Sequence, residues 1–197
     1  MRRRTWKIVV PLALAIGLVV GGLMVSQLLA TQPDSSETSE EIALPDWAQV
    51  ELIDAVSGEV FTIADFAGKP ILVESFAVWC STCLRQQREM ARLIELAGDA
   101  IVHVSLDTDP NEDLDKVRAH ADRNDFTWLF AIAPIDMTQE LIEAFGLTVV
   151  NAPRAPVILI EANGSARLLP NGVKSAEALL EEIGELPASS SEGAETS

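Results

Sequence analysis

ILVESFAVWCSTC, residues 71–83, contains both cysteines of this 197-residue chain. Its first eight residues are mostly apolar and strand-like, and residues 84–97 that follow have the apolar spacing of a helix. A Cys-x-x-Cys pair therefore stands where a strand gives way to a helix. The N-terminus of a helix has unpaired N–H groups and a partial positive charge, which stabilise a thiolate on Cys80. This layout predicts a reversible dithiol/disulfide formed by Cys80 and Cys83.

Two other interpretations of the cysteine pair, a structural disulfide and a zinc site, have less support from the sequence. A structural bridge between Cys80 and Cys83 closes a short loop and removes little entropy from the unfolded chain, because this effect grows with loop length. A zinc site needs two further ligands, and the only histidines are His103 and His120. His103 lies in an apolar strand and His120 in a polar helix, so each is expected to be structural or solvated. No metal and no cofactor are expected.

Strand and helix signals alternate on both sides of the motif. Residues 50–54 and 59–63 flank Ser57-Gly58 and predict a hairpin, and 157–161 and 166–169 flank Asn163-Gly164 in the same way. Further strands are expected at 71–78, 100–106 and, as a short edge strand, 128–132. Helices are expected at 84–97, 111–124, 138–145 and 175–183. This order predicts an α/β sandwich with a central mixed sheet, the thioredoxin plan.

Residues 45–183 resemble the membrane-anchored thioredoxin-like proteins of the TlpA/ResA type. The resemblance rests on FAVWCSTC, residues 76–83, and on RAPVILIEANG, residues 154–164. It implies that Cys80 attacks a disulfide and that Cys83 then resolves the mixed disulfide. The spacer Ser81-Thr82 lacks the proline that is usual in the family. The direction of electron flow therefore stays open.

The resemblance also implies roles for residues outside the cysteine pair. Glu74 stands where the family has a buried acid that exchanges a proton with the second cysteine, and burial would raise its pKa toward neutrality. The alternative is that Glu74 faces water from an edge strand. The Ala155-Pro156 bond is expected to be cis and to face the cysteines, where the preceding backbone pairs with a bound chain. Pro153 is a nearby competitor for this role. Trp79 is expected to shield the disulfide, or else to pack in the core.

The N-terminus predicts a membrane anchor. Residues 1–7 contain four basic residues and form a cytoplasmic segment, and residues 8–30 are an uncharged apolar stretch long enough to cross a bilayer. A cleaved signal peptide is the alternative, although the apolar stretch is longer than its usual core. Residues 31–44 have the composition of a disordered acidic linker, 45–187 form the thioredoxin-like domain, and 188–197 are a disordered tail. Both readings of the N-terminus place the domain outside the cytoplasm.

The formal net charge of −16 argues against binding to nucleic acid. The favoured function is a membrane-tethered, extracytoplasmic thiol–disulfide oxidoreductase that reduces disulfides of exported proteins. Its implied partner is a transmembrane dithiol carrier of electrons, because oxidising surroundings would otherwise leave the pair oxidised. Two alternatives are a thioredoxin-fold binding or chaperone module with a structural disulfide, and a thiol peroxidase. Cys80 lacks the Thr-x-x-Cys context that a peroxidase needs.

Overall fold

A computed structural model of the chain describes residues 42–184. The predicted cytoplasmic segment, the anchor at 8–30, most of the linker and the tail at 188–197 lie outside the described residues. Among residues 42–184, no helix combines the length and the apolar character that a membrane crossing requires.

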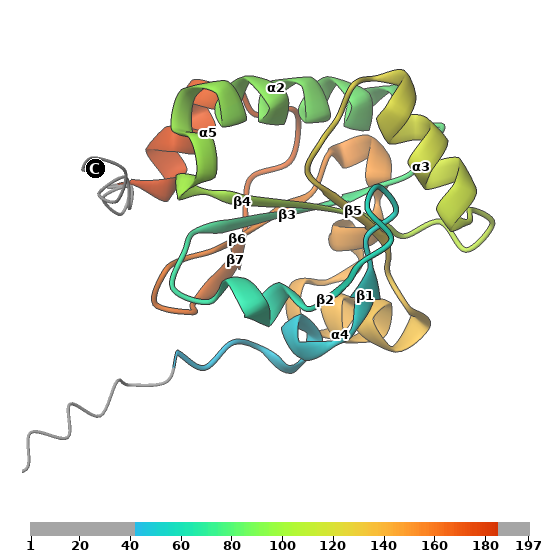
Figure 1. Cartoon of the computed structure of the whole chain (residues 1–197). Helices are drawn as coiled ribbons and strands as arrows, with labels where there is room; N and C mark the ends of the chain where they lie inside the picture. Colours follow the sequence, from blue (N-terminus) through green and yellow to red (C-terminus); the bar gives the residue numbers. More distant parts are fainter. Residues whose placement is uncertain (1–41, 185–197) are drawn as a thin grey trace, which may run out of the picture. The chain divides into compact units, whose positions relative to one another are not determined.

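The core of the domain is a five-stranded mixed sheet (Figure 1). β3 (Ile71–Phe76) is central, between β4 (Val102–Asp107) and β6 (Val157–Ile160), and β5 (Leu129–Ile132) and β7 (Ala166–Leu168) form the two edges. β3, β4 and β5 run parallel, whereas β6 is antiparallel to β3 and to β7. The sequence-based prediction of a mixed sheet with β3 inside and β5 at an edge is confirmed.

Helices cover both faces of the sheet. Figure 1 shows α2 (Ser81–Ala97), α3 (Leu114–Arg123) and α5 (Ala176–Ile183) on one side and α4 (Ile135–Phe145) on the other. All six side chains of β3 are buried, because each face of this strand is covered. The two faces have different partners: side chains of α4 pack with Ile71 and Val73, and side chains of α2 pack with Leu72. Glu74 and Phe76 alternate with Val73 and Ser75, so they share the α2 side with Leu72.

A small hairpin and short helical turns complete the domain. β1 (Leu52–Ile53) pairs antiparallel with β2 (Val60–Phe61), as predicted, and the Ala55 N–H donates to the Phe130 carbonyl of β5. The hairpin turn contains Gly58 with φ of +80°, a conformation that favours glycine. The 3-10 turns, which the sequence did not predict, are η1 (Asp46–Gln49), η2 (Ile63–Phe66), η3 (Gly98–Ala100), η4 (Leu147–Val150) and η5 (Ala152–Arg154).

The predicted helices are present, but their first residues differ from the prediction. α2 begins at Ser81 rather than at residue 84, because Cys80 acts as the N-cap. α3 begins at Leu114 rather than at residue 111, because the Asp113 side chain accepts the Lys116 N–H and caps the helix there. α4 begins three residues early, directly after Pro134. Each start is therefore set by a cap or a proline rather than by the first apolar residue.

Candidate active site

The cysteine pair lies at the N-terminus of α2. Cys80 and Cys83 form a disulfide, and both residues are buried, with exposed fractions of 4% and 1%. Cys80 is the N-cap residue, and its Sγ accepts the backbone N–H of Cys83 at 3.2 Å. A sulfur at this position meets the positive end of the helix and a direct N–H donor. Both favour a thiolate on Cys80 in the reduced protein.

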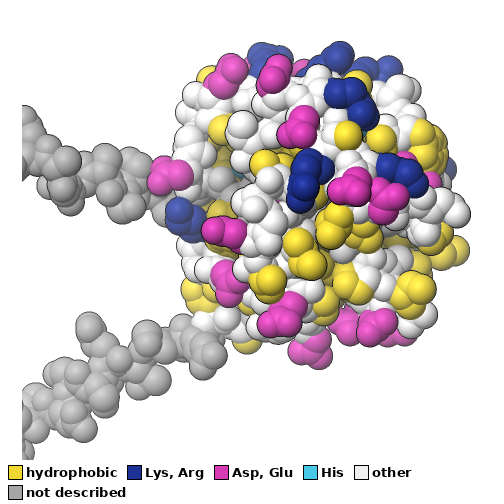
Figure 2. Space-filling view, turned by 45° about the vertical axis from the view of Figure 1, so that its right-hand side comes forward, with side chains coloured by type: hydrophobic (Ala, Val, Ile, Leu, Met, Phe, Trp, Pro, Cys, Tyr) yellow, Lys and Arg dark blue, Asp and Glu magenta, His cyan; other side chains and the backbone are white. Residues whose placement is uncertain are grey.

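Two arginines that follow the cysteine pair on α2, Arg85 and Arg88, add positive charge near it. Arg85 Nη2 donates to Thr82 Oγ1 in the spacer at 3.2 Å, and both Arg85 and Arg88 are exposed. Figure 2 shows Lys and Arg side chains mostly in the upper half of its view, whereas Asp and Glu side chains occur throughout. Solvent screens exposed charges, so the helix N-terminus is the larger influence on the buried Cys80.

The loop that faces the second cysteine comes from η5 and the residues after it. Cys83 Sγ lies 3.2 Å from the Ala152 carbonyl oxygen, where a reduced Cys83 thiol donates a hydrogen bond. Ala155 follows with φ of +46° and ψ of 58°, which is the left-handed region that alanine rarely adopts. Residues 152–156, named here the η5 loop, therefore turn sharply beside Cys83 before β6 begins.

The prediction of a cis Ala155-Pro156 bond is wrong, because the described residues contain no cis peptide. Instead, the left-handed Ala155 turns the chain just before Pro156. In this conformation the polar groups of this backbone have internal partners, and its pairing with a bound chain stays a prediction. The Ala155 N–H donates to the Ala152 carbonyl, and the Ala155 carbonyl accepts from Lys174 Nζ at 2.8 Å. The Pro156 carbonyl accepts the Ser75 N–H of β3 at 3.2 Å.

Glu74 lies beneath α2 and is fully buried, as the functional interpretation of the sequence requires. Its Oε2 accepts a hydrogen bond from Ser105 Oγ at 3.2 Å, and Trp128 Nε1 donates to the same Ser105 oxygen at 3.0 Å. Burial raises the Glu74 pKa to about 8, and Ser105, Gln87 and Lys174 each oppose the rise. A carboxyl group with this pKa takes up and releases a proton near neutral pH.

Gln87, on the helix that carries the cysteines, is one of the groups that oppose the rise of the Glu74 pKa. Gln87 is buried and stands one turn after Cys83 on α2, so the two side chains share a helix face. Its Oε1 lies 2.7 Å from His120 Nε2 of α3. His120 and His103 are both buried, and burial lowers the pKa of each, that of His103 to about 4. No group of three or more metal-ligating side chains occurs in the part of the chain that the structure describes.

Trp79 stands at the surface beside the pair and does not pack in the core. Its exposed fraction is 64%, and its Nε1 donates to Asp109 Oδ2 at 2.7 Å. It borders a groove of about 490 Å³. The groove is lined mainly by apolar side chains, from Ala77, Trp79, Thr108, Asp109, Pro110, Leu147, Val150, Asn151, Ala152 and Pro153.

An acidic segment after β4, which the sequence analysis missed, holds the backbone that leads to Cys80. Glu112 Oε2 accepts the Val78 N–H at 2.8 Å. Asp107 is buried at the end of β4, and burial together with a hydrogen bond to Glu112 raises its pKa. The sequence position of Asp107, at the end of a predicted strand, could have indicated that it lies near the cysteines. The ends of adjacent parallel strands meet at one edge of a sheet, and β3 ends just before the cysteines.

Residues 35–175 match the Redoxin family over more than half of the chain. The chain belongs to the Redoxin family. A thioredoxin-like protein of Bacillus subtilis strain 168, YneN, is 31% identical over 77 residues, which are 39% of this chain and 45% of YneN. The match thus spans less than half the length of that relative.

Solved structures show the fold of this Redoxin-family chain. A secreted Mycobacterium tuberculosis disulfide oxidoreductase homologous to Escherichia coli DsbE is 14% identical, with a TM-score of 0.56 over 70% of this chain and 96% of that one. The exposed lipoprotein thioredoxin Etrx1 of Streptococcus pneumoniae is 19% identical, with a TM-score of 0.55 over 68% and 96% of the two chains. The thioredoxin-like α/β fold predicted from the sequence is confirmed.

Proposed function

We propose that this chain is a thiol–disulfide oxidoreductase that exchanges electrons with protein disulfides through Cys80 and Cys83. The observation that carries the proposal is the Cys80–Cys83 disulfide at the start of α2, with Cys80 Sγ at the helix N-cap. Family membership and the thioredoxin-like fold support the same chemistry. A bridge across two intervening residues contributes little as a structural link, so its position favours redox chemistry.

The first step starts from the reduced pair. The Cys80 thiolate attacks one sulfur of a substrate disulfide, and a bond forms between Cys80 Sγ and that sulfur as the substrate S–S bond breaks. The other substrate sulfur leaves as a thiolate and takes a proton from the surroundings. The N–H of Cys83 and the helix N-terminus lower the energy of the attacking thiolate. The product is a mixed disulfide with Cys83 still reduced.

The second step releases the substrate. The Cys83 thiol passes its proton to the ionised form of Glu74, and the resulting thiolate attacks Cys80 Sγ. The mixed disulfide breaks, the Cys80–Cys83 disulfide forms, and the second substrate sulfur leaves as a thiol after protonation. Two electrons have then passed from the pair to the substrate. Glu74 suits this proton transfer because its pKa of about 8 is close to the ordinary value of a thiol.

The surface beside the pair supports a protein as the substrate. The groove between Trp79 and the η5 loop is open and mainly apolar, and Leu147 on its border is 74% exposed. An extended segment that carries a disulfide can lie along it, with Ala152 and Pro153 rather than Ala155 as its neighbours. The exposed Trp79 ring supplies a large apolar contact for such a segment.

The proposal also includes the tethering of the domain to the membrane and the direction of electron flow. The apolar residues 8–30, with four basic residues before them, support a single-pass anchor whose N-terminus is in the cytoplasm. The domain then reduces disulfides of exported proteins, and a transmembrane dithiol carrier restores its thiols. Retention of the chain in the membrane pellet after alkaline carbonate washing tests the anchor. Release by such washing would contradict it.

The experiment for the exchange activity uses the full-length chain in mild detergent. The reduced wild type is mixed with a protein disulfide substrate, and thiol release is followed beside Cys80→Ser and Cys83→Ser variants. We expect turnover by the wild type, no reaction by Cys80→Ser, and a trapped mixed disulfide with Cys83→Ser. Equal thiol release by wild type and Cys80→Ser would instead support a binding module whose disulfide is structural.

A further inference from the structure

Lys174, between β7 and α5, is a buried lysine with an unusual set of partners. Its Nζ donates to the carbonyl oxygens of Ala155 at 2.8 Å, Pro170 at 3.0 Å and Gly172 at 2.6 Å. An ammonium group has three protons, so its donors are fully used. One of the three bonds reaches the η5 loop at its left-handed residue. The Gly172 N–H adds a second link to that loop by donating to the Arg154 carbonyl at 2.8 Å.

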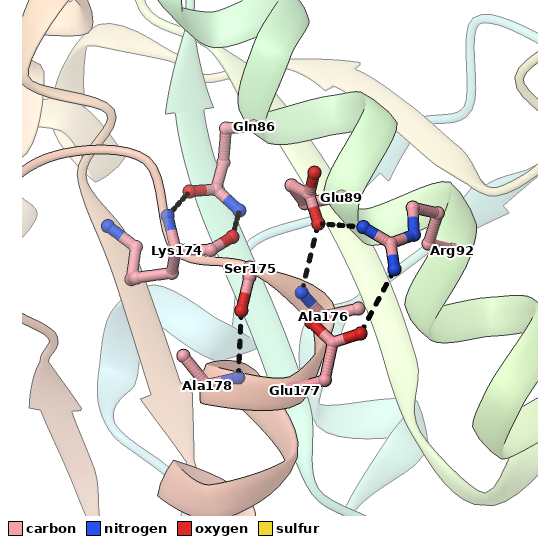
Figure 3. Close-up of polar contacts among 8 residues, drawn as sticks. All are labelled: Gln86, Glu89, Arg92, Lys174, Ser175, Ala176, Glu177 and Ala178. Carbon is pink, nitrogen blue, oxygen red and sulfur yellow. Dashed lines mark hydrogen bonds and ion pairs between the residues drawn. The ribbon is translucent and has the colours of Figure 1, made fainter.

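The backbone of Lys174 is fixed to the helix that carries the cysteines. Gln86, three residues after Cys83, accepts the Lys174 N–H at 2.8 Å and donates to the Lys174 carbonyl at 3.2 Å. Figure 3 shows this paired contact and the Lys174 side chain turning away from Gln86. Glu89 and Arg92 of α2 continue the connection by binding the start of α5. Lys174 is thus held in place on α2 and reaches across to the η5 loop.

The charge of Lys174 also acts on Glu74. In the sheet Glu74 pairs with Val157, the residue directly after the loop that Lys174 binds. The two side chains influence each other. Lys174 lowers the pKa of Glu74. Burial lowers the pKa of Lys174 to about 8, and the charge of Glu74 opposes this fall. The other buried titratable groups on the α2 side of the sheet include His103 and Asp107 on β4, and His120, which contacts Gln87; burial favours the neutral form of each.

We propose that Lys174 is a positioning residue of the redox site, which fixes the η5 loop against Cys83 and places a positive charge toward Glu74. The inference rests on the proposed exchange activity, because it assigns Lys174 to the second step of that reaction. A positive charge favours the ionised form of Glu74, which is the form that accepts the Cys83 proton. Lys174 therefore sets the pH at which the mixed disulfide is resolved. Its bond to the Ala155 carbonyl stabilises a conformation that alanine otherwise disfavours.

The test measures how fast a mixed disulfide on Cys80 is resolved as a function of pH, in the full chain. Lys174→Gln removes the charge and keeps an amide donor, and Lys174→Arg keeps the charge. We expect Lys174→Gln to move the midpoint of the profile up by about one pH unit, equal to roughly tenfold slower resolution at pH 7. Lys174→Arg should restore most of the rate. The matched control is Lys69→Gln, an exposed lysine whose Nζ also donates to a backbone carbonyl, that of Asp99.

A second measurement does not depend on activity or on a Lys174 variant. NMR of labelled lysine gives the pKa of Lys174 in the wild type and in Glu74→Gln. We expect the Lys174 pKa to fall by about one unit in Glu74→Gln, because a carboxylate that raises it is gone. An unchanged Lys174 pKa, or an unshifted resolution profile in an active Lys174→Gln variant, would overturn the inference. A wild type without exchange activity would refute the proposed function, and the NMR result would still decide whether Lys174 and Glu74 are coupled.

Discussion

Replacing Glu74 with glutamine is expected to change the pH dependence of stability in a defined direction. Burial raises the Glu74 pKa from 4.5 to about 8. Between these values the folded protein holds a proton that the unfolded chain has released, so stability falls as the pH rises. The loss is absent below pH 4.5 and complete above pH 8, where it amounts to about 5 kcal/mol. Glutamine resembles the protonated acid and cannot ionise.

Glu74→Gln should therefore match the wild type near pH 4.5 and exceed its stability at alkaline pH. We expect a gain of about 5 kcal/mol at pH 9, where the wild-type carboxyl is ionised; the Glu74 pKa of about 8 already includes the attraction to Lys174. The assay is urea denaturation of the oxidised full chain in one detergent, from pH 4.5 to 9. The difference between the two proteins cancels the titration of every group that Glu74 does not influence, so Lys174, whose pKa Glu74 raises, still contributes. Glu143→Gln, on the exposed side of α4, is the control.

The same variant separates the two catalytic steps. Glu74→Gln should leave the attack by Cys80 unchanged and slow resolution by Cys83, on the order of 10²-fold, the usual size of a general-base contribution.

In the stability series, a difference between Glu74→Gln and wild type that stays constant from pH 4.5 to 9 would contradict the raised pKa of Glu74. It would mean that Glu74 titrates alike in the folded and unfolded chain.

Three further variants test other parts of the account. Cys83→Ser should accumulate a mixed disulfide on Cys80, visible as a mass increase that a reductant reverses; no adduct would contradict the order of attack. Trp79→Ala should raise KM for a protein disulfide while changing the free energy of unfolding by less than about 0.5 kcal/mol, because the ring is exposed. Gly164→Ala should lower thermal stability by about 1–3 kcal/mol, since the new Cβ would lie 2.7 Å from the Ala43 carbonyl oxygen at φ of +90°. An unchanged Tm would contradict that strain.

The order of strands and helices could be predicted from sequence because it depends on local patterns. β3 was evident as an apolar run, and the hairpin between β6 and β7 was evident from Asn163-Gly164. The start of α2 was predicted three residues too late because its cap, Cys80, precedes the apolar pattern, and that of α3 three residues too early because its cap, Asp113, lies inside the predicted helix. Helix starts depend on such caps rather than on hydrophobic spacing.

The site could be predicted only where its residues are close in sequence. Cys80, Cys83 and Trp79 belong to one short motif, and the resemblance to a family pointed to Glu74. Lys174 was missed, since it lies 19 residues from Ala155 in the chain and no local pattern marks a buried lysine. The cis Ala155-Pro156 bond was wrong for a related reason. A left-handed alanine is disfavoured locally, and it depends on contacts from distant segments.

The most direct test of the central claim is the reduction potential of the Cys80–Cys83 pair in the full chain, measured by equilibration with thiol buffers. We predict a two-electron midpoint near that of thioredoxin, about −270 mV, as suits a reductant supplied with electrons across the membrane. A midpoint near roughly −120 mV would contradict the proposed direction, because the pair would then oxidise its partners. A pair that stays oxidised far below about −300 mV and traps no partner would show that the disulfide is structural and that the proposed exchange activity is wrong.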